Sequence, residues 1–196
     1  MRTKNFNIWI LVLIIFFANG CAQTAPKYQT TSSATQLTSI GSSPKISIGE
    51  INKNQARIDM ACRFSTISFE GGENVETYIK NAMVNEFKSA GIYSETSGKK
   101  LSANIDFISL DSFSALEILS PAMQNLTEAK WKITMTFKGN GVDPFTIPSI
   151  FMFPLRDGMF DFGDPCDNPS KKFGAAFANL IKILYKHPSF TKFITN

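Results

Sequence analysis

A strict alternation of apolar and polar residues marks the stretch from Trp131 to Lys138. Its apolar positions are Trp131, Ile133, Met135 and Phe137. A period of two is that of a β-strand with one buried face. A turn signal at 139–141 and a second alternating run at 145–153 follow, which together predict a β-hairpin. Pro148 lies inside the second run, and because proline cannot donate a ladder hydrogen bond, we expect that strand at an edge of the sheet.

Three further segments carry weaker strand patterns. Ile46 and Ile48 alternate with polar neighbours, and the residues of 101–110 are mostly apolar. Alternation is clear over 58–64, and this pattern extends through Ile67 and Phe69 to a glycine pair. We therefore expect short strands near 46–48, from 57 onward and at 101–110.

Two segments have the 3.6-residue period of amphipathic helices. In the first, the apolar residues are Val75, Tyr78, Ile79, Ala82, Met83, Phe87 and Ala90. Asn74 is placed to cap its N-terminus and Gly91 to end it. In the second, they are Phe173, Ala176, Phe177, Leu180, Ile181 and Leu184. There Asn168 is the expected N-cap, Pro169 suits the first helical position, and the pattern stops at His187 and Pro188.

The order of these elements predicts an α+β fold. Each helix has one apolar stripe to bury, and the simplest solution packs both helices on one face of a mainly antiparallel sheet, as an α/β sandwich. We expect a single domain over residues 45–196.

The N-terminus has the layout of a signal peptide. Arg2 and Lys4 precede a ten-residue apolar run at 8–17. That run is about half of the ~20 residues that a membrane-spanning helix needs. Residues 18–21, Ala-Asn-Gly-Cys, follow it and resemble a bacterial lipobox, in which the cysteine is lipidated and becomes the first residue of the mature chain. The resemblance implies a signal peptide at 1–20 and lipidation of Cys21.

Two other interpretations of Cys21 stay open. Cleavage nearby would leave the cysteine incidental, and an uncleaved run would be a transmembrane anchor. The lipobox family also favours Leu where Ala18 stands. Ala22 follows the cysteine, whereas an inner-membrane retention signal resembles Asp there, so we expect the protein at the periplasm-facing side of the outer membrane.

Residues 22–44 are rich in Ser, Thr, Gln, Ala, Gly and Pro. Such a composition buries too little apolar surface to offset its ordering entropy. We expect residues 21–44 to be the lipidated cysteine with a flexible tether of ~25–30 Å reach.

Charge gives little indication of a partner. The formal net charge is +4, from 20 Lys and Arg against 16 Asp and Glu, and the expected leader holds two of the cations. No basic stripe is evident, so we expect no nucleic-acid partner.

Cys62 and Cys166 remain once Cys21 carries lipid. In an oxidising compartment two leftover cysteines usually pair, and we expect a disulfide between them. Two buried thiols, or a metal or redox role, are the alternatives.

Other polar residues show no convergent catalytic set. Asp161, Asp164 and Asp167 could bind a hard cation, but their spacing is not that of an EF-hand, and a turn before a helix explains them as well. His187 is the only histidine and is expected at a helix C-terminus. We therefore expect no metal, no cofactor and no enzymatic activity. The apolar stretch 115–126 is either a loop that covers the sheet or an exposed patch for a partner.

In layout, residues 45–196 resemble small periplasm-facing lipoproteins, the YajG-like and LptE-like envelope-assembly lipoproteins. The likeness lies in Cys21, the strand and helix at 56–91, the hairpin at 130–153, and Cys166 followed by FGAAFANLIKILYKHPSF. It implies a non-enzymatic assembly or transport accessory that is membrane-bound through Cys21 and contacts an envelope protein. A binder of a lipid or other apolar ligand is the first alternative, and a hydrolase using a serine or the three aspartates is the second.

Overall fold

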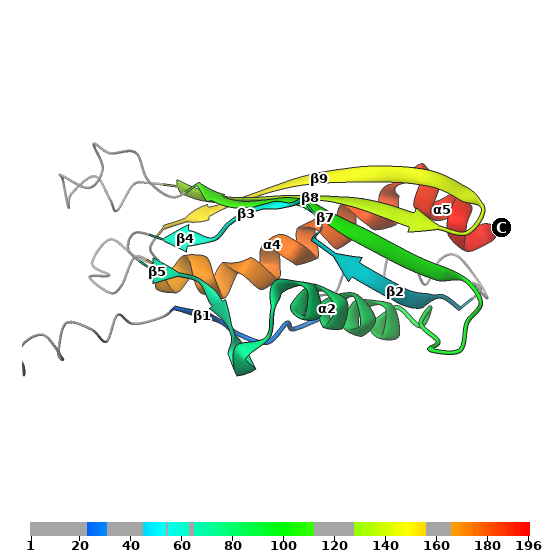
Figure 1. Cartoon of the computed structure of the whole chain (residues 1–196), viewed down its shortest axis with the longest axis horizontal. Helices are drawn as coiled ribbons and strands as arrows, with labels where there is room; N and C mark the ends of the chain where they lie inside the picture. The colour runs from blue at the N-terminus through cyan, green and yellow to red at the C-terminus, as the bar shows by residue number, and fades with distance from the viewer. Residues whose placement is uncertain (1–22, 31–44, 54, 63–64, 112–127, 156–165) are drawn as a thin grey trace, which may run out of the picture.

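The protein is described by a computed structural model (Figure 1), in which residues 23–30, 45–53, 55–62, 65–111, 128–155 and 166–196 are placed. Within those residues the main sheet has five strands. They are β2 (Ser47–Asn52), β3 (Arg57–Asp59), β7 (Lys100–Asp111), β8 (Glu128–Gly139) and β9 (Val142–Pro154). The helices are α2 (Val75–Ser89), α4 (Asp167–Lys186) and α5 (Pro188–Thr195), with a short 3-10 turn at Glu70–Gly72.

The sheet is antiparallel over its long strands and parallel at one edge. β8 pairs antiparallel with both β7 and β9, which confirms the predicted hairpin. β2 and β3 lie one after the other along β7, and both pair with it in parallel. Within the placed residues β9 has β8 as its one strand partner, so Pro148 lies on an edge strand as predicted.

The helices pack on one face of this sheet, which confirms the predicted α+β class (Figure 1). α2 contacts β2, and α4 lies along β9 and β8. The second helix ends before His187 as predicted, but Pro188 then begins α5, which also packs on β9. In the first turn of a helix the backbone amides have no intrahelical partner, so a proline is tolerated there. Pro188, which cannot continue α4, can therefore begin α5.

A large aromatic core joins the two layers. Its bulkiest fully buried side chains are Trp131, Phe87, Phe137, Phe173, Phe177, Phe190 and Phe193. The Trp131 indole donates a hydrogen bond of 3.0 Å to the Pro169 carbonyl and packs edge-on against Phe173 at 5.0 Å between ring centroids. Strand β8 is therefore fastened to the first turn of α4.

The predicted strand beginning at residue 57 is broken into pieces. After β3 come β4 (Ala61–Cys62), β5 (Ser65–Thr66) and β6 (Ser68–Phe69). β4 and β5 pair antiparallel, so the chain reverses between them and cannot continue as one strand to Phe69. The predicted extension of this strand through Ile67 and Phe69 is therefore wrong. Phe69 belongs to β6, which pairs with Thr24–Ala25, and Ile67 lies between β5 and β6 with its amide bonded to the Met60 carbonyl.

A β-bulge in β7 explains why Phe107 is only half-buried. The pairing register with β8 shifts between Ile105 and Phe107, and the buried apolar positions change from 101, 103 and 105 to 108 and 110. Because one extra residue reverses the alternation, Phe107 lies on the face away from the helices.

The helix ends agree with the sequence in one case and differ in the other. The Asn74 side chain accepts a hydrogen bond of 2.8 Å from the Thr77 amide, and Gly91 adopts φ 71° after α2, both as predicted. α4 begins at Asp167, one residue before the expected cap Asn168. The Asn168 side chain instead donates to the Pro154 carbonyl at 2.6 Å, which ties the helix start to the end of β9.

Candidate functional site

The N-terminal segment 23–30 lies between α2 and α4 (Figure 1). Its first part forms β1 (Thr24–Ala25), which pairs in parallel with β6. Ala25 is fully buried, and β1 packs against α4. This stretch was expected to belong to a flexible tether, but in the structure it is part of the domain.

Hydrogen bonds hold the segment along its length. The Ser68 amide donates to the Gln23 carbonyl at 2.9 Å, and the Lys27 amide donates to the Glu70 carboxylate at 3.0 Å. From α2, the Tyr78 hydroxyl donates to the Pro26 carbonyl at 3.2 Å. An extended segment with its own backbone bonds satisfied in this way is ordered by the fold that surrounds it.

Tyr28 closes the far end of the segment. Its hydroxyl donates to a carboxylate oxygen of Glu86 at 2.6 Å, and its ring packs edge-on against Phe177 of α4 at 5.9 Å. Glu86 is fully buried in α2, so this bond supplies part of the compensation that a buried carboxylate needs. The segment therefore provides a partner for a polar group of the core.

Two buried phenols beside this segment have perturbed ionisation. Burial, reinforced by the nearby charge of Glu73, raises the pKa of Tyr78 to about 12. Burial, followed by the charge of Glu86, raises the pKa of Tyr185 further. Both phenols are neutral over the ordinary pH range, and Tyr78 thereby keeps the proton that it donates to Pro26.

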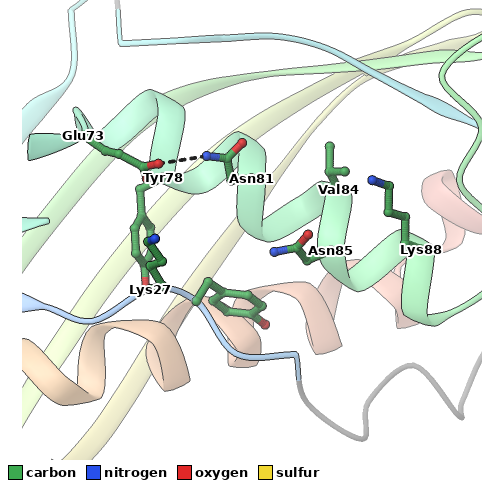
Figure 2. A pocket seen from close by; sticks show the side chains of 8 residues that line it. Lys27, Glu73, Tyr78, Asn81, Val84, Asn85 and Lys88 are labelled. Atoms are coloured by element: carbon green, nitrogen blue, oxygen red, sulfur yellow. Dashed lines mark hydrogen bonds between the residues drawn. The ribbon is translucent and has the colours of Figure 1, made fainter. Parts of the chain in front are cut away.

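Two open grooves flank the segment. One, of about 410 Å³, lies on the α2 side and is lined by Lys27, Tyr28, Glu73, Tyr78, Asn81, Val84, Asn85 and Lys88 (Figure 2). In it Asn81 donates to Glu73 at 3.1 Å. The other, of about 270 Å³, lies toward α4 and includes Lys27, Lys171 and Gly174. The groove on the α2 side has a mostly polar lining with charged side chains, which is unlike the apolar lining of a typical small-molecule site.

Sequence reasoning missed this docked segment because most of its residues are small or polar. Tyr28 was the one available indication, as a bulky side chain within a Ser- and Thr-rich stretch. A second indication is Gly174 in α4, where an added Cβ would lie 3.3 Å from the Tyr78 hydroxyl and 3.8 Å from the Tyr28 ring. A small residue at this position lets the helix approach both tyrosines.

The structure joins Cys62 and Cys166 in a disulfide, as predicted, with their Cα atoms 5.7 Å apart. Cys62 is at the end of β4, and Cys166 is the residue before α4. Both are buried. The bridge therefore fixes the start of α4 to the short β4–β5 hairpin.

The other candidate residues are not brought together into a reactive site. The His187 ring stacks on Phe145 at 4.7 Å. Its backbone amide donates to the Leu184 carbonyl at 3.0 Å, so it caps the end of α4 as predicted, and its Nδ1 atom accepts from the Ser189 amide, so its side chain also caps the start of α5. Asp167 pairs with Lys171 at 2.6 Å in the first turn of α4. Cys21, Asp161, Asp164 and the stretch 115–126 lie outside the described residues. Among those that are described, no group of three or more His, Cys, Asp and Glu side chains could hold a metal ion.

The sheet face opposite the helices carries an apolar and basic patch. Ile150 and Met152 of β9 are each 59% exposed. They lie opposite Lys132 and Lys130 of β8 in the pairing register. Lys132 contacts Asp111 at 2.6 Å and Lys130 contacts it at 3.8 Å. The hydrogen bond from Lys132 and the charges of both lysines lower the pKa of the Asp111 carboxyl. We call Ile150, Met152, Lys130 and Lys132 the open-face patch.

Comparisons with known proteins show no family for this chain. No protein-family model matches the sequence, and no curated protein matches it. A solved structure with a similar outline is that of a Xanthomonas campestris protein of the DUF330 family, with 11% identity, coverage of 78% of this chain and 85% of that chain, and a TM-score of 0.44. A likeness at this level supports no inference about function. Within the placed part of the chain, no helix has the length and apolarity needed to span a membrane.

Proposed function

We propose that this protein is a non-enzymatic lipoprotein that is anchored through acyl chains on Cys21 and acts by contacting another protein of the cell envelope. The open-face patch carries this proposal. Large apolar side chains that are mostly exposed and adjacent on one sheet face are typical of interaction surfaces. The finer proposal places the protein among the YajG-like and LptE-like assembly lipoproteins, on the periplasmic side of the outer membrane.

The anchor is supported by the N-terminal sequence. A short apolar run, two small residues and a cysteine precede Gln23, where the described chain begins. Burial of acyl chains contributes ~0.8 kcal/mol per CH₂ group, and stable anchoring needs more than one chain. Three acyl chains, as in the bacterial lipoproteins that the motif resembles, meet this need.

Contact through side chains of the open face, rather than through strand addition, fits the edge strand β9. Pro144, Pro148 and Pro154 interrupt its hydrogen-bonding capacity, and the Asn179 side chain of α4 donates to the Ile150 carbonyl at 3.4 Å. Proline on an edge strand is a recognised obstacle to pairing with another strand. A partner would therefore recognise the exposed side chains of the patch.

Crosslinking in cells tests the role of the patch. A photo-crosslinking amino acid in place of Thr134, which follows Lys132 by two residues on the same face of β8, should capture an envelope protein. Ile150→Lys combined with Met152→Lys should abolish that product, because two charges would have to be desolvated at the contact. Thr146→Lys, on the same strand and face, is the matched control and should keep the product. Equal capture by the double variant and the control would refute the patch as the contact.

A further inference from the structure

We propose that residues 23–30 are a rigid mount, which seats the domain directly on a lipid surface with the N-terminal end of α4 and the β4–β5 hairpin nearest the lipid. The proposal rests on lipidation of Cys21. In place of a domain that moves freely on a long flexible tether, the proposal describes a domain held in a defined orientation at the membrane.

The first step is the length of chain between the anchor and the fold. Ala22 and Gln23 alone separate Cys21 from Thr24, and a fully extended chain covers at most ~3.3–3.6 Å per residue. The anchored cysteine can therefore be no more than ~11 Å from β1. A flexible tether over 22–44 would instead reach ~25–30 Å.

The second step is how firmly β1 is held. Thr24 and Ala25 pair with Ser68 and Phe69, and Ala25 is fully buried. Further along the segment, Tyr78 and Glu86 of α2 bind Pro26 and Tyr28. To free the segment, the domain would have to expose Ala25 and remove the Tyr28 partner of a buried carboxylate, which is costly.

The third step is the direction in which the chain leaves the domain. Phe69, beside Ala25, packs against Phe173 near the start of α4, whereas Tyr28 packs against Phe177, one turn further along. Followed backward from Tyr28, the chain therefore runs toward the N-terminal end of α4, where the disulfide holds the β4–β5 hairpin. In Figure 1 the same end carries the labels β1, β4 and β5.

The opposite end of the molecule is then far from the lipid. Trp131 of β8 is level with Pro169 in the first turn of α4, and Asn140 lies beyond the other end of that strand. Nine residues of strand at ~3.4 Å each separate the two levels by ~30 Å. Since Trp131 pairs with Phe151, the open-face patch falls in the half of the sheet nearer the lipid. A partner there would be reached close to the membrane surface.

Depth-dependent quenching tests the mount in the full-length lipidated protein. A dye is attached through a click-reactive amino acid at Lys171 or at Asn140, both exposed, so that the disulfide is left intact. The protein is reconstituted in vesicles of phosphatidylethanolamine and phosphatidylglycerol with a nitroxide on some head groups. Quenching should be several-fold stronger at position 171 than at position 140.

An insertion variant supplies the matched control. A 20-residue Gly- and Ser-rich insertion between Ala22 and Gln23 leaves the fold intact and restores a reach of ~22–27 Å. It should bring the quenching at position 171 down toward that at position 140. Equal quenching at both positions without the insertion would overturn the mount.

The mass of the purified protein distinguishes a failure of the lipid anchor at Cys21 from a failure of the mount at residues 23–30. A mass without acyl chains, together with failure to float with the vesicles, would overturn the anchor and the mount together. An acylated mass with equal quenching would overturn the mount alone.

Discussion

The hydroxyls of Tyr28 and Tyr78 are the polar groups through which α2 and the N-terminal segment recognise each other. Tyr28 donates into the helix, to Glu86, and Tyr78 donates out of it, to the Pro26 carbonyl. Each bond joins groups that are at least partly buried, where the loss of one partner leaves the other unsatisfied. A few residues thus decide whether segment 23–30 belongs to the domain or to its tether.

Tyr78 gives this contact a dependence on alkaline pH. Its pKa is raised from 10 to about 12 in the folded protein, so the neutral phenol is favoured by folding. The contribution of Tyr78 to the free energy of unfolding is fully present below pH 10. It is lost as the pH rises from 10 to about 12, because in this range the phenol ionises in the unfolded chain before it ionises in the folded protein. In Tyr78→Phe the free energy of unfolding should therefore fall less steeply over this window than in the wild type.

Urea unfolding at pH 9, 10 and 11 measures that difference. Tyr185 remains in both proteins, so its own alkaline titration cancels from the comparison. Parallel losses of stability in the variant and the wild type would contradict the assignment to Tyr78.

Among the elements, those with local patterns were predictable and those with distant partners were not. The alternation at 131–138 and the stripe from Val75 to Ala90 specify β8 and α2 because side-chain period follows backbone geometry. The parallel pairing of β2 and β3 with β7 is not specified by any such local sequence pattern. The β4–β5 reversal and the docking of β1 likewise depend on partners far along the chain, and small residues such as Ala25 carry no periodic pattern. Of the candidate site, the Cys62–Cys166 pair was predictable and the segment at Tyr28 was not.

The disulfide is the element-level contact whose contribution is easiest to measure. It joins residues 104 apart, and the chain-entropy model assigns ~4–5 kcal/mol to a loop of this size, whereas loss of a native disulfide typically costs ~2–5 kcal/mol. The double variant Cys62→Ala, Cys166→Ala should lose stability in that range. Chemical denaturation with and without a reductant provides the control, because the reductant should lower the wild type toward the variant and leave the variant unchanged. A variant as stable as the oxidised wild type would show that the bridge does not stabilise the domain.

For the whole molecule, the proposed anchor, the proposed mount and the open-face patch form one spatial arrangement. The N-terminal chain enters at the end of the sandwich that the disulfide fastens, and the helices cover one face of the sheet (Figure 1). The open-face patch lies on the other face. A lipid at Cys21 would set the height of the patch above the membrane through segment 23–30. This arrangement suits a protein that meets its partner at the membrane surface rather than one that binds a ligand in its core, which is filled by aromatic side chains.

Lipidation of Cys21 is the claim on which this arrangement depends most, and metabolic labelling with a radioactive fatty acid tests it directly. The full-length wild type should incorporate label and fractionate with the envelope membranes. Cys21→Ala should lose the label, while the double variant Cys62→Ala, Cys166→Ala should keep it, because those two cysteines are joined in a buried disulfide and offer no thiol for acylation. Undiminished incorporation in Cys21→Ala would contradict the anchor and, with it, the orientation proposed for the domain.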